Sequence, residues 1–325
     1  MEREASILKA FAIKGEGGGQ VLEGDAISKT IKADQLAWVH LDGNHPDTKT
    51  WLEREVSYLD NLIIEALLEQ NTRPRMIEYD QGALLILRGV NLNEDAEPED
   101  MISIRLWIDA SRIISVRLRP LKAVQDLWKK LENGAGPKNS GEFIGALSGR
   151  LFERMEPVFT DLDARLDDIE EEVMECPDKH LRAAITDIRK QAIIFRRYIA
   201  PQKDAIAQLR NSDLPWLEQN HKRKLQENLD RVTRYVEDLD TIRERAQIVK
   251  DELANALADK MNKNMYVLTI VAAIFLPLGF LTGLLGINVG GIPGAEYDGA
   301  FFVFSGILLS IVAVQILTFK LLKWF

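Results

Sequence analysis

The 325-residue sequence contains a single cysteine, Cys176, which excludes an intrachain disulfide and any CxxC zinc site. It also lacks a nucleophile–base pairing, a phosphate-binding glycine loop and a cofactor motif, which argues against an enzyme. Basic residues are in the minority, with 41 Lys and Arg against 50 Asp and Glu and a formal net charge of −9. This balance argues against nucleic acid as a partner and favours a surface that concentrates cations. The first residues contain no long apolar run, so we expect no cleaved signal peptide.

Two stretches near the C-terminal end lack charge altogether. Residues 265–285 and 300–319 contain no Asp, Glu, Lys, Arg or His. A helix of about 20 mainly apolar residues is long enough to cross the hydrocarbon core of a bilayer. The alternative is a buried core helix of a soluble protein, but two such stretches so close together favour a transmembrane hairpin. We therefore predict spans at about 265–285 and 300–319, joined by a short outer loop at 286–299.

The predicted loop has no Lys or Arg and contains Glu296 and Asp298. Positive charges lie instead on the outer flanks of the hairpin, at Lys260, Lys263, Lys320 and Lys323. Lysine and arginine near the ends of spans mark the cytoplasmic side of a membrane. We therefore expect a multi-pass protein of the cytoplasmic (inner) membrane, with the lipid bilayer as a partner and both termini in the cytoplasm.

The part before the spans divides according to its secondary-structure signals. Residues 1–133 combine β-branched runs with short helical patterns and are predicted to form a cytoplasmic α/β domain. Residues 134–263 are predicted to form a cytoplasmic helical region with a long stalk helix, and residues 264–325 the transmembrane hairpin. The predicted fold class is an α+β cytoplasmic domain with long helices, followed by a two-helix C-terminal transmembrane hairpin.

Glycine and proline are absent between Trp216 and Pro277. A helix of that length would extend about 90 Å. Apolar residues recur along it at steps of three and four from Leu225 to Leu257. This spacing is typical of a helix that packs against neighbouring helices.

The opposite face of the long helix changes from polar to small and apolar residues as it enters the first predicted span. One interpretation is an exposed helix face followed by small residues that let transmembrane helices approach. The other is a helix that lines an axial path, which requires several copies of the chain because one hairpin cannot enclose a pore. Leu268 and Leu276 could close such a path by dewetting, although Leu268 and Thr269 compete for one position. The pore-lining candidates are Asp251, Asn255, Asn262, Met265, Leu268, Thr269, Ala272, Leu276, Gly279, Gly283 and, at the outer mouth, Asn288.

Two segments of the soluble part carry weaker signals. His40, Asp42 and His45 are weak candidates for a metal site, since imidazole and carboxylate both bind zinc, and the alternative is a strand that ends in a polar turn. Residues 161–173 are rich in carboxylates. They form either a solvated helix face, with pairs such as Asp161 with Arg165, or an acidic collar that draws divalent cations toward a pore mouth. These two interpretations of residues 161–173 are compatible with each other.

Gly286, Ile287 and Asn288 follow the first predicted span and resemble the Gly-Met-Asn signature of the CorA family of divalent-cation channels, with Ile287 in place of the usual Met. The longer segment GINVGGIPG (286–294) resembles the zinc transporters of that family rather than its magnesium channels. Residues 71–91 and 195–204 are also similar to those zinc transporters. The resemblance covers essentially the whole chain. It implies a funnel-shaped homopentamer, zinc as the main substrate and assistance from a proton gradient.

The resemblance also implies roles for single residues. Asp251 and Asn262 correspond to polar pore-side positions of the family, and Asn288 to an ion contact at the outer mouth. Asn288 would equally suit a helix cap or a loop brace, since asparagine is a turn residue. The first span offers no carboxylate, imidazole or thiolate, so we expect the ion to pass largely hydrated.

The sequence therefore predicts transport of divalent metal cations, with zinc favoured, through an axial pore of a homo-oligomer. No cofactor is expected besides the transported ion. A magnesium or cobalt channel of the same family shares every feature except the ion. A membrane-tethered coiled-coil protein without transport is the alternative from another class, and the stripe that continues to Asn288 argues against it.

Overall fold

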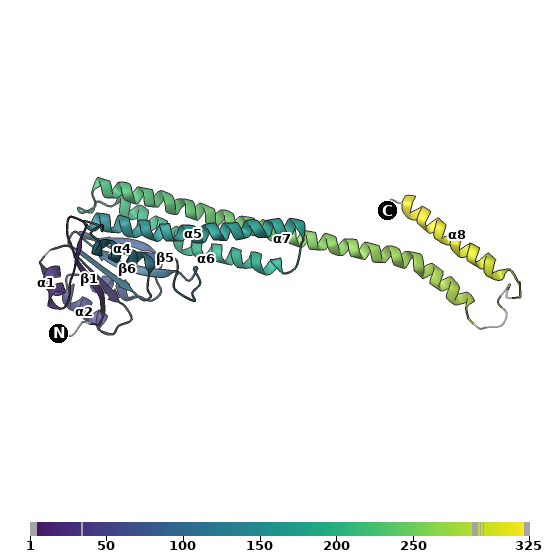
Figure 1. The fold of residues 1–325 in the computed structure, drawn as a ribbon, viewed down its shortest axis with the longest axis horizontal. Coiled ribbons are helices and arrows are strands. Elements are labelled where there is room, and N and C mark those ends of the chain that lie inside the picture. Colours follow the sequence, from purple (N-terminus) through teal and green to yellow (C-terminus); the bar gives the residue numbers. More distant parts are fainter. Residues whose placement is uncertain (1–4, 34, 288–291, 293, 295, 322–325) are drawn as a thin grey trace. The chain divides into compact units, whose positions relative to one another are not determined.

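The computed structural model describes residues 5–33, 35–287, 292, 294 and 296–321. These residues form two compact units, residues 1–251 and residues 252–325. The first unit holds a mixed β-sheet and most of the helices, and the second holds two apolar helical segments. The predicted combination of an α+β part, long helices and two apolar C-terminal helices is confirmed (Figure 1).

The sheet has seven strands in the order β2-β1-β3-β7-β6-β5-β4. Strands β3 and β7 pair in parallel, and the other neighbours are antiparallel. The central strands are buried on both faces, which explains why they read as nearly continuous apolar runs rather than as a strict alternation. The strands are β1 (Ile7–Ile13), β2 (Gly19–Val21), β3 (Ala37–Asp42), β4 (Arg75–Tyr79), β5 (Gly82–Gly89), β6 (Ile102–Ile108) and β7 (Arg112–Arg117).

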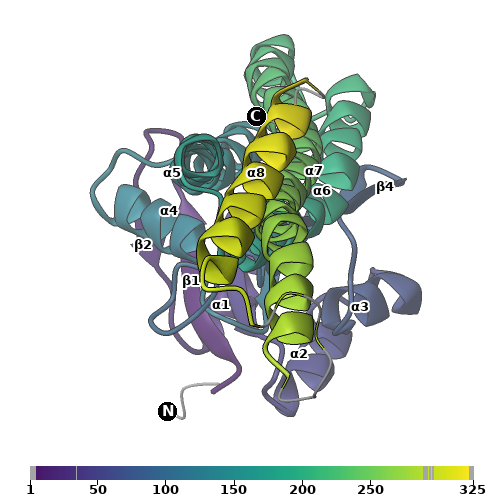
Figure 2. The same ribbon diagram turned by 90° about the vertical axis from the view of Figure 1, so that its right-hand side faces the viewer.

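Helices cover both faces of the sheet (Figures 1 and 2). On one face, α1 (Asp25–Lys32), α2 (Asp47–Glu55) and α3 (Asn61–Leu68) enclose a core that includes Val39, Leu52 and Ile114. On the other face, α4 (Lys122–Glu132) and α5 (Ser140–Glu175) contribute Trp128 and Phe143, whose rings contact Trp38. The sheet is thus a middle layer between helices, and the face covered by α4 and α5 is the one that packs against a long helix.

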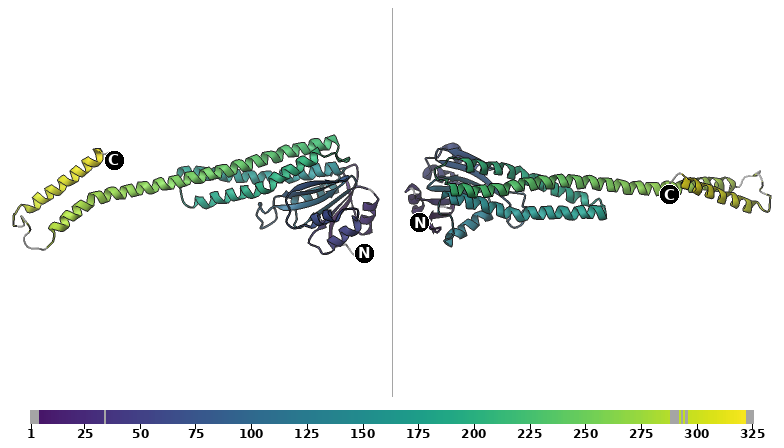
Figure 3. Two further views of the ribbon diagram at one scale, coloured as in Figure 1. Left: turned by 180° about the vertical axis from the view of Figure 1, so that it is seen from behind. Right: turned by 90° about the horizontal axis from the view of Figure 1, so that it is seen from above.

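Three long helices form the rest of the first unit. Helix α5 begins after Asn139, whose side-chain oxygen accepts a hydrogen bond from the backbone N–H of Glu142 at 2.8 Å. It ends at Glu175, and the proline at 177 disfavours the helical conformation at the residue before it. Helix α6 (Leu181–Asn211) continues through Pro201. Figure 3 shows α5 and α6 alongside the N-terminal part of α7 (Gln219–Leu285).

Helix α7 is 67 residues long, so it extends about 100 Å at the usual rise per residue. Its predicted packing stripe is confirmed, since Leu225, Val232, Leu239 and Val249 are all buried. The helix does not stop at Pro277 but continues through it to Leu285.

The second unit contains residues 252–285 of α7 and the helix α8 (Ala300–Leu321). Both α7 and α8 contain apolar stretches long enough to cross a membrane. Most side chains of these stretches are exposed in the single chain, unlike those of a core helix in a soluble protein.

Candidate functional site

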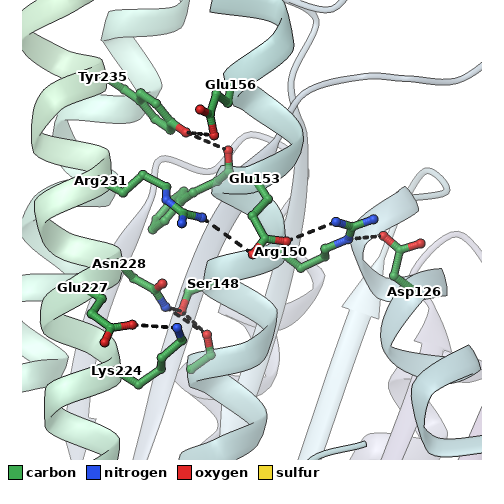
Figure 4. Close-up of polar contacts among 12 residues, drawn as sticks. Asp126, Ser148, Arg150, Glu153, Glu156, Lys224, Glu227, Asn228, Arg231 and Tyr235 are labelled. Atoms are coloured by element: carbon green, nitrogen blue, oxygen red, sulfur yellow. Dashed lines mark hydrogen bonds and ion pairs between the residues drawn. The ribbon is translucent and has the colours of Figure 1, made fainter. Parts of the chain in front are cut away.

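Helix α7 is fixed on α5 by buried polar contacts (Figure 4). The side-chain amide of Asn228 donates hydrogen bonds to the backbone oxygen of Gly145 and to Ser148 Oγ, both at 2.9 Å. Further along, the hydroxyl of Tyr235 donates to the backbone oxygen of Phe152 at 3.2 Å. Burial of polar groups is costly unless they are paired, so these contacts set how α7 is rotated about its own axis against α5.

The acidic segment of α5 meets one arginine of α7. Arg245 pairs with Asp163 at 3.0 Å and with Asp167 and Glu170 at 2.5 Å each. The hydrogen bonds that the Arg245 guanidinium donates to Asp167 and Glu170 raise the pKa of Arg245 above its usual value. Part of the predicted acidic collar is therefore neutralised within the chain, while Asp168 and its neighbours at 171–172 are exposed. Arg245 carries no signal of this role in the sequence, because only the packing of α7 on α5 brings it to these carboxylates.

The polar half of the predicted stripe lies on an exposed part of α7. Asp251, Asn255 and Asn262 are all exposed. A carboxylate oxygen of Asp251 accepts a hydrogen bond from Gln247 Nε2 at 2.9 Å, one helical turn earlier. These side chains are accessible to a hydrated ion.

In the apolar half of α7, covered and uncovered side chains fall on opposite faces. Ile270 is only 8% exposed, whereas Leu268 and Leu276 are 70% and 71% exposed. At 100° per residue, the centres of the two faces are about half a turn apart. The covered or partly covered face consists of Ile270, Ala273, Ile274, Leu278 and Leu281. The opposite face consists of the exposed candidates Met265, Leu268, Thr269, Ala272, Leu276, Gly279 and Gly283.

The covered face is the one that meets α8, because the side chain of Gln315 in α8 donates to the backbone oxygen of Ala273. Other exposed residues, such as Phe275 and Phe280, border the opposite face, so exposure alone does not define the stripe. Both Leu268 and Thr269 are exposed, so their exposure in the single chain does not distinguish which of them would face the axis of the path.

Few groups along the uncovered face could bind an ion directly. The Thr269 hydroxyl donates to the Met265 backbone oxygen at 2.8 Å and is thus satisfied within its own helix. Gly279 and Gly283 have open space where a Cβ would be, so another helix or a hydrated ion can approach the backbone there. This chemistry suits an ion that keeps its water shell.

The signature motif begins where α7 ends. The backbone N–H of Gly286 donates to the Thr282 backbone oxygen at 2.9 Å, and a Cβ at Gly286 would lie 2.8 Å from that same oxygen. Glycine is therefore required for this close approach. Ile287 is exposed, and Asn288 lies outside the described residues.

The candidate metal ligands of β3 are placed in different surroundings. His40 is fully buried, its Nδ1 lies 2.7 Å from Ser115 Oγ, and burial lowers its pKa to about 3. Asp42 instead accepts a hydrogen bond from the backbone N–H of Asn44, which forms a polar turn at the strand end. In the part of the chain that the structure describes, no group of three or more His, Cys, Asp or Glu side chains could hold a metal ion. The arrangement gives no support to a metal site at His40, Asp42 and His45.

Comparison with known proteins places the chain in a family. The model of the CorA-like Mg²⁺ transporter protein family matches residues 33–323. The divalent cation transporter CmaX of Pseudomonas aeruginosa is 37% identical over 99% of this chain and 97% of its own length. The zinc transport protein ZntB of Yersinia enterocolitica is 33% identical over 97% of this chain and 95% of its own length.

The fold agrees with these sequence matches. The structure of full-length CmaX superposes with a TM-score of 0.86 at 36% identity and covers 99% of both chains. The family consists of membrane transporters, and this chain has the two apolar C-terminal helices that such a protein needs. The chain belongs to the CorA family of divalent metal-ion transporters and is not an enzyme.

Proposed function

We propose that the protein transports zinc through an axial pore lined by the uncovered face of α7. One observation carries the proposal: a stripe of residues at steps of three and four along α7 changes from Asp251, Asn255 and Asn262 to small and apolar residues in the apolar span, and all of them are exposed. Among the described residues of the single chain, nothing buries this stripe, either in its polar part or where it continues into the apolar span. Several copies arranged with this stripe inward would enclose it, and α8 would then lie outside against lipid.

The number of copies rests on the resemblance to the family, which implies a homopentamer with a funnel-shaped cytoplasmic part. In this arrangement residues 1–133 and 134–263 form the cytoplasmic body, and residues 264–325 form the membrane hairpin. A stable monomer or dimer in a mass measurement of the detergent-solubilised protein would refute the proposal of an axial pore.

Zinc is favoured over magnesium on two grounds. The segment GINVGGIPG resembles the zinc transporters, and the protein named ZntB in Yersinia enterocolitica matches nearly the whole chain.

The proposed path suits an ion that keeps its water shell. The first apolar span lacks the carboxylate, imidazole and thiolate ligands that bind dehydrated zinc, so the ion passes largely hydrated. The exposed carboxylates of α5 that Arg245 leaves unpaired attract divalent cations to the cytoplasmic side.

Zinc flux into liposomes that contain the purified protein tests this function. We expect zinc uptake that exceeds uptake of magnesium or cobalt in competition, and a faster rate when a proton gradient is applied. Magnesium flux that zinc does not compete with would instead indicate a magnesium channel of the same family. Wild-type protein that is oligomeric but conducts no divalent ion would support the tethered coiled-coil alternative.

The proposed topology places the protein in the inner membrane with both termini in the cytoplasm and Glu296 outside. In a Cys176→Ser background, Glu296→Cys should react with an impermeant thiol reagent in intact cells, because the loop would be exposed on the outer side. Asp178→Cys, in the first unit, is the matched control and should react only after permeabilisation. The opposite labelling pattern would invert the topology.

A further inference from the structure

Gln315 is an amide side chain in the apolar helix α8. Its Nε2 donates a hydrogen bond to the backbone oxygen of Ala273 in α7 at 3.2 Å, across 42 positions of the sequence. Its Oε1 is buried and has no hydrogen-bond partner among the described residues. An amide surrounded by hydrocarbon is costly, so the contact with Ala273 is its main compensation in this part of the chain.

The carbonyl that Gln315 contacts is the one that Pro277 leaves without its helical donor. In an α-helix the N–H of residue 277 would bond to the carbonyl of residue 273. Proline has no N–H, and its ring also crowds the carbonyl four residues earlier, which bends the helix. Helix α7 nevertheless continues through Pro277 to Leu285, and Figure 3 shows that it curves toward this end.

We propose that Gln315 is a positioning residue for α7, because it supplies from α8 the hydrogen bond that Pro277 removes. Leu276 and Gly279, both on the uncovered face, lie next to Pro277. The direction of the bend sets how far these residues stand from the axis of the proposed pore, so α8 controls the width of the path without lining it. This assignment rests on the proposed transport function.

A double-mutant cycle tests the assignment. Gln315→Met keeps the side-chain length but removes the donor, and it should lower the maximal zinc flux about fivefold, the factor that one hydrogen bond of ordinary net strength supplies. The zinc concentration at half-maximal flux should stay the same, because the ion contacts are intact. In a Pro277→Ala background the alanine N–H bonds to Ala273, so Gln315→Met should change the flux less than twofold.

Ser310→Ala is the matched control in α8. The Ser310 hydroxyl donates to the Gly306 backbone oxygen of its own helix, so its loss should leave flux unchanged in both backgrounds. If Pro277→Ala conducts poorly, the unfolding temperatures of the wild type, the two single variants and the double variant give a second readout. Gln315→Met should lower the unfolding temperature less in the Pro277→Ala background than in the wild type. Equal effects of Gln315→Met in both backgrounds, in flux and in unfolding temperature, would overturn the positioning role of Gln315 and leave the proposed transport function intact. Absence of zinc flux in the wild type would refute the proposed function and the positioning role with it.

Discussion

Asn288→Ala is expected to reduce zinc flux roughly hundredfold, with oligomer assembly and thermal stability close to the wild type. In the proposed oligomer, the Asn288 side chains would ring the outer entrance, and each carbonyl oxygen would accept a hydrogen bond from the water shell of the ion. Such a neutral ring favours entry of the ion without trapping it. Loss of several bonds of about 1 kcal/mol each accounts for an effect of this size.

The Asn288→Asp protein is the companion variant. A ring of like charges holds divalent ions longer, so this variant should still bind zinc but show a changed order of ion preference. Normal transport by Asn288→Ala would make Asn288 a loop brace only. Poor transport accompanied by misassembly would show instead that its role is to cap the helix.

Gly279→Leu is expected to abolish zinc flux. Apart from the backbone of its own helical turn, no described atom lies within 4 Å of the position of a Cβ at Gly279, so this part of the chain accommodates the larger side chain. Leucine also favours helix over glycine by up to about 1 kcal/mol, so the helix itself is not weakened. If the uncovered face of α7 surrounds an axis, one leucine from every copy would then fill the path.

Gly306→Leu is the matched control for this prediction, because Gly306 in α8 also has open space at its Cβ position. Since α8 would face lipid, this variant should conduct like the wild type. Both proteins should be compared at equal oligomer content by flux and by size. Equal loss in the two variants would mean that leucine disturbs assembly, and wild-type flux in Gly279→Leu would place the path elsewhere.

The long elements were predictable because their signals are local. The absence of glycine and proline after Trp216 indicated α7. The β-branched runs of β3, β5, β6 and β7 indicated the central strands, which are buried on both faces.

Several short elements were not predicted, because tertiary contacts stabilise them. The edge strand β4 buries only Met76, so its sequence shows neither an apolar run nor a regular alternation. Helix α1 has eight residues and buries only Ile27 and Ile31, too few to establish a helical period. β1, β2 and α4 were likewise not identified in advance. β1 pairs with β3, and Trp128 of α4 contacts Trp38, so these contacts join residues distant in the sequence.

For the candidate site, the sequence indicated the stripe on α7 but not the contacts that orient it. Helical spacing predicts which residues share a face, whereas the partners of Arg245 and Gln315 lie on other helices. The predicted span at 265–285 agrees with the course of α7, which continues through Pro277 to Leu285. The hydrogen bond from Gln315 to the Ala273 backbone oxygen was not predictable, because it joins residues of two different helices.

Accessibility of cysteines along α7 tests the central claim most directly. With Cys176, the single native cysteine, replaced by serine, each position from 265 to 283 is changed in turn to cysteine, and zinc flux is measured before and after a small water-soluble thiol reagent. We expect block at Thr269, Ala272, Leu276 and Gly279, and no block at Ile270, Ala273 or Ile274. Block that follows the face toward α8, or block without helical periodicity, would contradict the claim that the uncovered face of α7 lines the path.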